Sequence, residues 1–362
     1  MRRSARLYIA LAAFLVTTTA LATALAAGDD ILEFYRGRQI KIYIRAAPGG
    51  NYDIYSRLLG RYIARYLPGN PMVLPFNMPG GGGLVALNYV ANVAPQDGTV
   101  LTMITPSFPM DQALGFDKNL KVDLRKLGWI GNMSDSSIIY FTKTSSATRT
   151  LADAQRRVTL VAATGNGSIV PQLVAVYNNM LRTRFKIIFG YPNGPDMTLA
   201  MERGEVEGRS TTNPQILLGP GATTADVRAH FNFIIQTGMK KLPGYEDVPL
   251  LRDLARNEDE RRIFDFVSQA VAISRPVVTT PNVPAARVTA LRRAFDAALA
   301  DPGFLAEARR LELEIAPMSG EQVQALVETM LDTPPDVLAK IAKAVQVKSS
   351  EAAAEPQSGP RN

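Results

Sequence analysis

Three glycine-rich segments of the chain could bind an anion through their backbone. They are Pro48–Gly50, Pro79–Gly83 and Gly165–Ser168, and each stands between a stretch with strand character and a stretch with helix character. The first turn of a helix carries unpaired N–H groups and a partial positive charge, which together attract negative groups. Glycine lets a ligand approach the backbone closely and permits a positive φ. A single loop of this kind is more often a plain connector, but three in one chain favour a ligand site.

Side chains near these loops add aromatic and polar groups. Tyr52 follows the first loop, and Tyr191 stands in a further loop over residues 190–195. Either ring could line a cleft or pack on a neighbouring helix. Asp53 falls in the first turn of a predicted helix, where a carboxylate complements the helix dipole. The alternative is a ligand role, and because a carboxylate repels an anion, Asp53 would then act through water or on a cationic or hydroxyl group.

The residues needed for other chemistry are missing or isolated. The chain has no cysteine, which excludes disulfides, thiolate metal sites and a cysteine nucleophile. The single histidine, His230, has no metal-ligand spacing around it, and we interpret it as a partly buried structural residue. Gly80–Gly83 lacks the lysine of a phosphate-binding loop, and Val170 stands where a dinucleotide-binding loop has its third glycine. Ser168 has no neighbouring base, so we predict no catalytic residue, no metal site and no cofactor.

The elements that would position these loops alternate between short strands and amphipathic helices. This order occurs twice, once in each half of the chain, and predicts two α/β units with parallel strands and right-handed crossovers. We expect residues 270–273 to form a strand that returns to the first unit, followed by helices from Pro284 onward. The expected strands are 40–44, 72–76, 100–104, 158–162 and 185–189, and the expected helices are 54–67, 84–92, 169–181 and 196–203.

The two ends of the chain differ from the rest. Basic residues within the first six positions precede an apolar run from Leu7 to Leu25, and Ala-Leu-Ala at 24–26 has the pattern of a cleavage site. Residues 1–27 are therefore predicted to be a signal peptide, cleaved near Ala26 or Ala27. A retained membrane anchor is the alternative, because the apolar run is long enough to span a membrane. Residues 349–362 are polar and aperiodic, and we predict a disordered tail.

The composition indicates a globular protein of two domains. The chain has 362 residues, of which 46% are hydrophobic, so it can bury a sizeable core without disulfides. Its net charge is +7, but the basic residues are scattered and no stripe combines them with aromatic residues, which argues against nucleic-acid binding. We expect residues 28–135 and 268–348 to form a first lobe that includes the C-terminal helices, and residues 136–267 to form a second lobe.

Five stretches of the sequence carry a family pattern: IRAAPGGNYDIYSRLL, NMPGGGGLVALNYVANVAPQDGTVLTM, TGNGSIVPQLVAVYNNM, GYPNGPDMTLAMERGEVEG and LPGYEDVPLLRDL. In this order they resemble blocks of the receptors of tripartite tricarboxylate transporters, the periplasmic solute-binding proteins of the TctC/Bug type. The likeness covers about residues 31–345, and its first two blocks are the most specific. After Ser168 the chain departs from the family pattern, which leaves the identity of the ligand open.

The resemblance implies an α/β, two-lobe periplasmic-binding-protein-like (type II) fold. Each lobe would contain a mainly parallel sheet flanked by helices, with a ligand cleft between the lobes. The ligand would be a small carboxylate, held by backbone amides and ordered waters. Together with the residues considered above and Ser107, which follows the third predicted strand, the candidate ligand-binding residues are Pro48, Gly49, Gly50, Tyr52, Asp53, Gly80, Gly81, Gly82, Gly83, Ser107, Gly165, Gly167, Ser168, Tyr191 and Gly194.

We therefore expect a non-enzymatic receptor that captures a small carboxylate in the periplasm. It would be a monomer that delivers its ligand to integral-membrane subunits of the TctA/TctB type and binds no nucleic acid. A sensory binding protein that signals to a two-component system is one alternative, since it would use the same cleft. A periplasmic hydrolase that uses Asp53 or Ser168 is another, although the sequence supplies no base for it.

Overall fold

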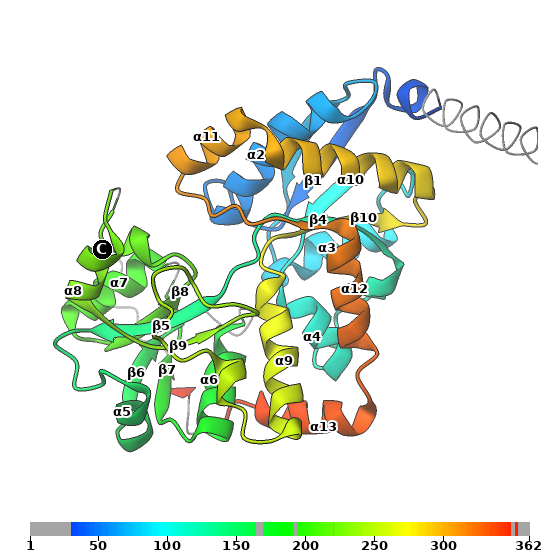
Figure 1. Cartoon of the computed structure of the whole chain (residues 1–362). Coiled ribbons are helices and arrows are strands. Elements are labelled where there is room, and N and C mark those ends of the chain that lie inside the picture. Colours follow the sequence, from blue (N-terminus) through cyan, green and yellow to red (C-terminus); the bar gives the residue numbers. More distant parts are fainter. Residues whose placement is uncertain (1–29, 164–168, 192–193, 220, 349–351, 354–362) are drawn as a thin grey trace, which may run out of the picture.

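The computed structural model of the chain contains two six-stranded sheets with helices packed against them (Figure 1). The predicted two-lobe α/β fold is therefore confirmed. The predicted signal peptide lies outside the described residues, as does most of the predicted disordered tail. The structure describes residues 30–163, 169–191, 194–219, 221–348 and 352–353.

The first sheet joins the beginning of the chain to two strands from its last third, in the order β11-β4-β10-β3-β1-β2. Strand β1 is parallel to both β2 and β3, and Ile44 at its end lies opposite Asn77 and Met103. These three strands therefore end at the same edge of the sheet, whereas β10 runs in the opposite direction and pairs antiparallel with both β3 and β4. The strands are β1 (Gln39–Ile44), β2 (Met72–Asn77), β3 (Val100–Met103), β4 (Leu127–Asn132), β10 (Pro276–Pro281) and β11 (Met318–Ser319).

The second sheet has the order β12-β7-β6-β8-β5-β9 and a similar division. Strands β7, β6 and β8 are parallel, and β5 pairs antiparallel with β8 and β9. Strand β12 lies within the segment for which the sequence predicts disorder, and it pairs parallel with β7. The strands are β5 (Ile138–Lys143), β6 (Thr159–Ala162), β7 (Phe185–Ile188), β8 (Gly208–Thr211), β9 (Phe231–Thr237) and β12 (Ala352–Ala353).

The helices cover the sheets with their apolar faces. Helix α2, for example, buries Leu58, Leu59 and Ile63 against the first sheet and α10, because these residues recur at helical spacing. None of the helices in the described ranges combines the length and the apolar character that a membrane crossing needs. The helices are α2 (Asn51–Tyr66), α3 (Leu84–Asn92), α4 (Ser107–Leu114), α5 (Leu151–Arg156), α6 (Val170–Leu181), α7 (Gly194–Arg203), α8 (Thr224–His230), α9 (Glu258–Ala272), α10 (Ala285–Ala300), α11 (Pro302–Arg310), α12 (Gly320–Leu331) and α13 (Pro335–Ala344), with short 3₁₀ turns η1 (Gly81–Gly83), η2 (Leu124–Lys126), η3 (Pro214–Leu217) and η4 (Leu251–Leu254).

The prediction of a strand at residues 270–273 is wrong, because residues 270–272 end helix α9 and Ile273 is its C-cap. The side chain of Asn257 caps this helix, and its first turn is acidic, which favours helix formation. The end of the helix is buried all round, and a short apolar run alone does not distinguish a buried helix from a strand. The strand that returns to the first sheet is β10, a few residues later.

Two chain segments cross between the sheets side by side, one between β4 and β5 and one between α9 and β10, and the segment before β11 pairs with the first of them. The N–H of Met133 donates to the carbonyl of Arg275 at 3.1 Å, and the N–H of Asp135 donates to the carbonyl of Ala316 at 2.6 Å. Helix α9 packs against α4, α12 and α13 as well as β9, so it contacts elements of both lobes (Figure 1). Any movement of one lobe relative to the other must therefore occur around these crossing segments and along α9.

Candidate functional site

The first two glycine loops and Ser107 lie at one edge of the first sheet. The loop Pro48–Gly50 follows β1 and leads into α2, Gly80–Gly83 follows β2 and leads into α3, and Ser107 begins α4 after β3. Because the three strands are parallel and end in register, the segments after them are brought together. The structure thus places these sequence-predicted residues at the carboxyl edge of the sheet, where open α/β sheets bind ligands.

The second loop adopts a backbone that favours glycine at four successive positions. The φ values of Gly80, Gly81, Gly82 and Gly83 are 137°, 53°, 63° and 105°. A Cβ atom on Gly83 would overlap the side chain of Arg45, so the arginine lies directly on this loop. The loop therefore presents main-chain atoms, without side chains of its own, at the start of α3.

Helices that begin at these sheet edges lack side-chain caps. No side chain caps α2, α3, α4 or α6, whose N-cap residues are Gly50, Gly83, Pro106 and Ile169. Helices α10 and α13 start after prolines and also lack a cap. The other helices with a described start do have side-chain caps: α5 (Thr150), α8 (Thr223), α9 (Asn257), α11 (Asp301) and α12 (Ser319). The uncapped first turns at the sheet edges can therefore serve a ligand.

The carboxylate of Asp53 forms its hydrogen bonds within the protein. It is 4% exposed, and its Oδ2 accepts the N–H of Gly49 at 2.9 Å. Its Oδ1 accepts from Arg57 Nε and Asn77 Nδ2, both at 2.8 Å. Burial raises the pKa of Asp53, but the hydrogen bonds from Gly49, Asn77 and Arg57 outweigh it and lower the pKa below its ordinary value. The carboxylate thus ties the first loop to α2 and β2.

Two arginines that the sequence does not single out as site residues, Arg45 and Arg275, flank the ring of Tyr52. The guanidinium of Arg45 lies 4.2 Å from the centre of the Tyr52 ring, and that of Arg275 lies 4.9 Å from it. Arg45 also donates through Nε to the carbonyl of Gly82 at 3.2 Å, and Nε of Arg275 is buried without a partner in the described structure. Within the described ranges, neither arginine forms a salt bridge with a carboxylate. In the sequence, Arg45 is indicated as a site residue only by its place directly after a strand and before a glycine loop.

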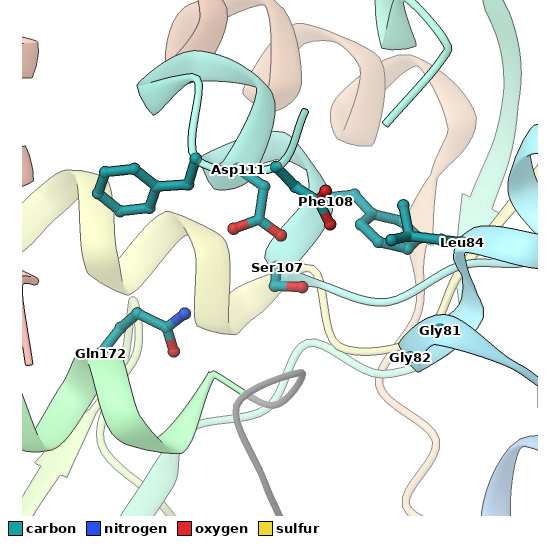
Figure 2. Close-up of a pocket in the computed structure, with 9 residues that line it drawn as sticks. Gly81, Gly82, Leu84, Ser107, Phe108, Asp111 and Gln172 are labelled. Atoms are coloured by element: carbon teal, nitrogen blue, oxygen red, sulfur yellow. The ribbon is translucent and has the colours of Figure 1, made fainter. Parts of the chain in front are cut away.

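A cavity of about 230 Å³ lies between α4 of the first lobe and α6 of the second. Figure 2 shows the carboxylate of Asp111 and the amide of Gln172 facing each other from these two helices, with Ser107 beside them. Gly81 and Gly82 form another part of the wall. The cavity therefore joins three sequence-predicted residues, Gly81, Gly82 and Ser107, to a side chain from the opposite lobe.

The charged residues that line this cavity are Asp111 and Asp117. Burial raises the pKa of Asp111 to about 6, a hydrogen bond from Ser107 opposes this, and the charge of Asp117 adds to it. A carboxyl group with this pKa accepts a hydrogen bond from a ligand hydroxyl or amine when it is ionised. It can donate one when it is protonated in mildly acidic solution.

In the second lobe the predicted residues are only partly described. Gly165, Gly167 and Ser168 lie outside the described residues. Tyr191 is buried with Phe141 and Met201, and its hydroxyl donates to Glu205 at 3.4 Å. Gly194 begins α7, close to the guanidinium of Arg209.

The interpretation of His230 as a partly buried residue is wrong. It is exposed in the last turn of α8, where its Nδ1 lies 2.9 Å from the carbonyl of Asp226. Histidine favours this position because its positive form complements the C-terminal end of the helix dipole. Among the described residues, no group of three or more histidine or carboxylate side chains is arranged to hold a metal ion.

Comparison with known proteins supports the fold. No model of a known protein family matches the chain, and no curated protein matches it. Among solved structures, it is similar to a TctC solute-binding protein from Polaromonas, with 18% identity and a TM-score of 0.64 over 84% of this chain and 99% of the other. It is also similar to the periplasmic binding protein BugD (18% identity, TM-score 0.60, 88% and 100% coverage). MatC from Rhodopseudomonas palustris, whose structure contains bound malate, has 18% identity and a TM-score of 0.59 over 83% of this chain and 99% of MatC. The chain therefore has the fold of TctC- and Bug-type solute-binding proteins.

Proposed function

We propose that the chain is an extracytoplasmic solute-binding receptor for a small carboxylate. The observation that supports this most is that uncapped helix starts, and Arg45 on the carbonyl of Gly82, lie beside a cavity lined from both lobes. Helix N-termini and guanidinium groups both favour carboxylates, through N–H donors and positive charge. The fold shared with solute-binding proteins supports the same conclusion.

The ligand would bind between the lobes and draw them together. Residues 28–135 and 268–348 would form one lobe, residues 136–267 would form the other, and the crossing segments would act as the hinge. The carboxylate would bind at the helix starts, while Asp111 would accept a hydrogen bond from a hydroxyl or amino group of the ligand. A hydroxy acid such as malate, the ligand in the MatC structure, has both kinds of group.

The receptor would act in the periplasm after removal of the signal peptide near Ala26 or Ala27. It would be a monomer without enzymatic activity, and it would deliver its ligand to TctA/TctB-like integral-membrane subunits. The apolar run between Leu7 and Leu25 and the small residues after it support export. The absence of a base beside any nucleophile in the sequence supports binding without turnover.

Thermal unfolding in the presence of carboxylates tests this proposal. The chain from Gly28 onward would be mixed with acetate, succinate, malate, adipate and citrate, with the neutral diamide of succinate as a control. A ligand at about 100 times its Kd is expected to raise the Tm by roughly 4 °C for a protein of this size. The proposal fails if no carboxylate stabilises the protein, or if the neutral diamide stabilises it equally.

A further inference from the structure

The last helix of the chain, α13, contacts elements of both lobes. By its place in the sequence it belongs with the C-terminal helices of the first lobe, and it packs against α4 of that lobe. It also packs against α9 and against α6 of the second lobe (Figure 1). Its buried residues, with Val345 directly after it, belong to one apolar cluster with Val176 and Leu181 of α6. Helix α13 therefore shares a core with the second lobe.

The side chain of Asn179, near the end of α6, is hydrogen-bonded to the end of α13. Its Nδ2 donates to the carbonyl of Ala344 at 3.0 Å and to that of Gln346 at 3.1 Å. The last carbonyls of a helix have no partner within the helix, so a donor from another element fixes the helix end. Further along the chain, β12 pairs with β7 of the second sheet. The end of the chain is thus attached to the second lobe by side-chain and backbone contacts.

The ion pair between α13 and α9 lies at the opposite end of α9 from the crossing segments. Lys340 of α13 pairs with Asp259, in the first turn of α9, at 2.6 Å. The crossing segment that contains Arg275 follows the last turn of the same helix, and it pairs with the other crossing segment through Met133. Helix α9 has 15 residues, which corresponds to a length of about 22 Å. The lobes are therefore joined at two places that lie this far apart.

Two attachments at this separation restrict how the lobes can move. A pair of crossing segments alone permits bending in several directions, whereas two fixed places leave only rotation about the line that joins them. This line runs along α9, which packs against α4, α12 and α13 as well as β9. Rotation about α9 changes the distance between the lobes at the cleft and leaves the contacts of α13 intact.

Apolar contacts hold α13 in place more than the ion pair does. The side chains of Lys340 and Asp259 are 47% and 56% exposed, and an ion pair of this kind contributes little. Ile341, in contrast, is fully buried, and Val345 is 2% exposed. A charged residue at position 345 should therefore release the end of this segment from the second lobe.

We propose that residues 335–346 form a strap that joins the two lobes and confines opening of the protein to a rotation about α9. The strap remains on both lobes as the cleft opens, so it limits how far they separate. When its end is released, only the crossing segments and the contacts of α9 hold the lobes together, and the cleft opens further.

Distances between spin labels test the strap in the chain from Gly28 onward. The chain has no cysteine, so pairs of introduced cysteines are the only labelling sites. Val85→Cys on α3 with Leu199→Cys on α7 reports on the two lobes, and Lys343→Cys on the strap with Arg184→Cys before β7 reports on the attachment of the strap. All four positions are exposed. Without ligand, double electron–electron resonance should give a narrow distance distribution for the strap pair and a broader one for the lobe pair.

Val345→Asp is the variant that releases the strap, and Gln346→Asp is its matched control. Both place the same charge at neighbouring positions, but Val345 is buried and Gln346 is exposed. In Val345→Asp we expect the distances of both label pairs to lengthen by several ångströms and their distributions to broaden, whereas Gln346→Asp should match the wild type. Asn179→Ala removes the hydrogen bonds to the strap without a new charge, and it should shift both distances in the same direction by less.

Asn179→Ala keeps the test decisive if Val345→Asp does not fold. The strap is refuted if the releasing variants that fold leave the distance between positions 85 and 199 unchanged, or if Gln346→Asp lengthens it as much as Val345→Asp does. It is also refuted if the strap pair of the wild type has a distribution as broad as that of the lobe pair. These measurements need no ligand, so their outcome is independent of the proposed function.

Discussion

The carboxylate of Asp53 accepts the backbone N–H of Gly49 at 2.9 Å, four residues earlier in the chain. The same side chain is hydrogen-bonded to Arg57 and Asn77, and Asn77 also donates to the carbonyl of Ala46 at 2.8 Å. Helix α2 and strand β2 therefore hold the loop before α2 from both sides. Asp53 orders the backbone that a ligand would meet.

Replacement of Asp53 is expected to reduce stability and ligand binding together. Asp53→Asn keeps the size of the side chain but replaces one acceptor oxygen by an NH₂ group, so it loses hydrogen bonds to buried donors. We expect the free energy of unfolding at pH 7 to fall by about 1–3 kcal/mol, measured by urea denaturation. Because the pKa of Asp53 is lowered in the fold, its contribution is present above about pH 4 and disappears as the pH falls through the folded value. The difference between variant and wild type should therefore narrow in acid.

Asp336 provides the matched control for this experiment. It also stands in the first turn of a helix, α13, but it is exposed. Asp336→Asn should change the free energy of unfolding by less than about 1 kcal/mol, since only the interaction with the helix dipole is lost. An equally small effect of Asp53→Asn would mean that Asp53 only complements the dipole of α2.

Gly83 is expected to control the position of Arg45. A methyl group at Gly83 would overlap Arg45 and would also force alanine to a φ of 105°. Gly83→Ala should therefore weaken carboxylate binding in a calorimetric titration as well as lower stability. Gly115→Ala is the control: its φ is 65°, and no atom lies within 4 Å of the added methyl group. It should lower the free energy of unfolding by about 1–2 kcal/mol without a change in affinity. Equal affinity losses in both variants would contradict a specific role for Gly83.

Alternation of short strands and helices was enough to predict most of the parallel halves of the two sheets. Strand β1 alternates buried and exposed residues along its first half, and helix α2 has an apolar face at helical spacing, so both follow directly from the sequence pattern. The antiparallel strands β4 and β5 were missed, because both are buried almost throughout and show no alternation. The apolar end of α9 was ambiguous for the same reason.

For the candidate site, the sequence predicted the loops better than the side chains. The positions of Gly80–Gly83 and Ser107 depend on parallel strands that end at one edge, which the strand order already implies. The roles of Arg45 and Arg275 depend on contacts across the fold, between residues as far apart as Tyr52 and Arg275. Such contacts leave no local pattern. Among many scattered basic residues, the unpaired ones become visible only once the salt bridges of the others are known.

Arg45 is expected to strengthen ligand binding through its charge. Arg45→Met keeps an apolar side chain over the ring of Tyr52 but removes the positive charge beside the glycine loops. We expect the affinity for the best-bound carboxylate to fall about 10-fold or more, since a charge-assisted hydrogen bond is lost. Arg38→Met is the control, because Arg38 lies 4.3 Å from the ring of Phe34 and is exposed. A similar loss in both variants would assign the effect to the overall charge of the protein.

Asp111 is expected to make stability depend on pH in the opposite direction to Asp53. Burial raises its pKa to about 6, so the folded state favours the protonated form. Its stabilising contribution is complete below about pH 4 and is lost as the pH rises through 6. Asp111→Asn mimics the protonated carboxyl. At pH 8 we expect its free energy of unfolding to exceed that of the wild type by about 1–2 kcal/mol, so that the variant is more stable. This advantage should vanish near pH 4 in parallel urea titrations. A constant difference at all pH values would show that Asp111 does not titrate with a raised pKa, and that the cavity between α4 and α6 does not enclose it.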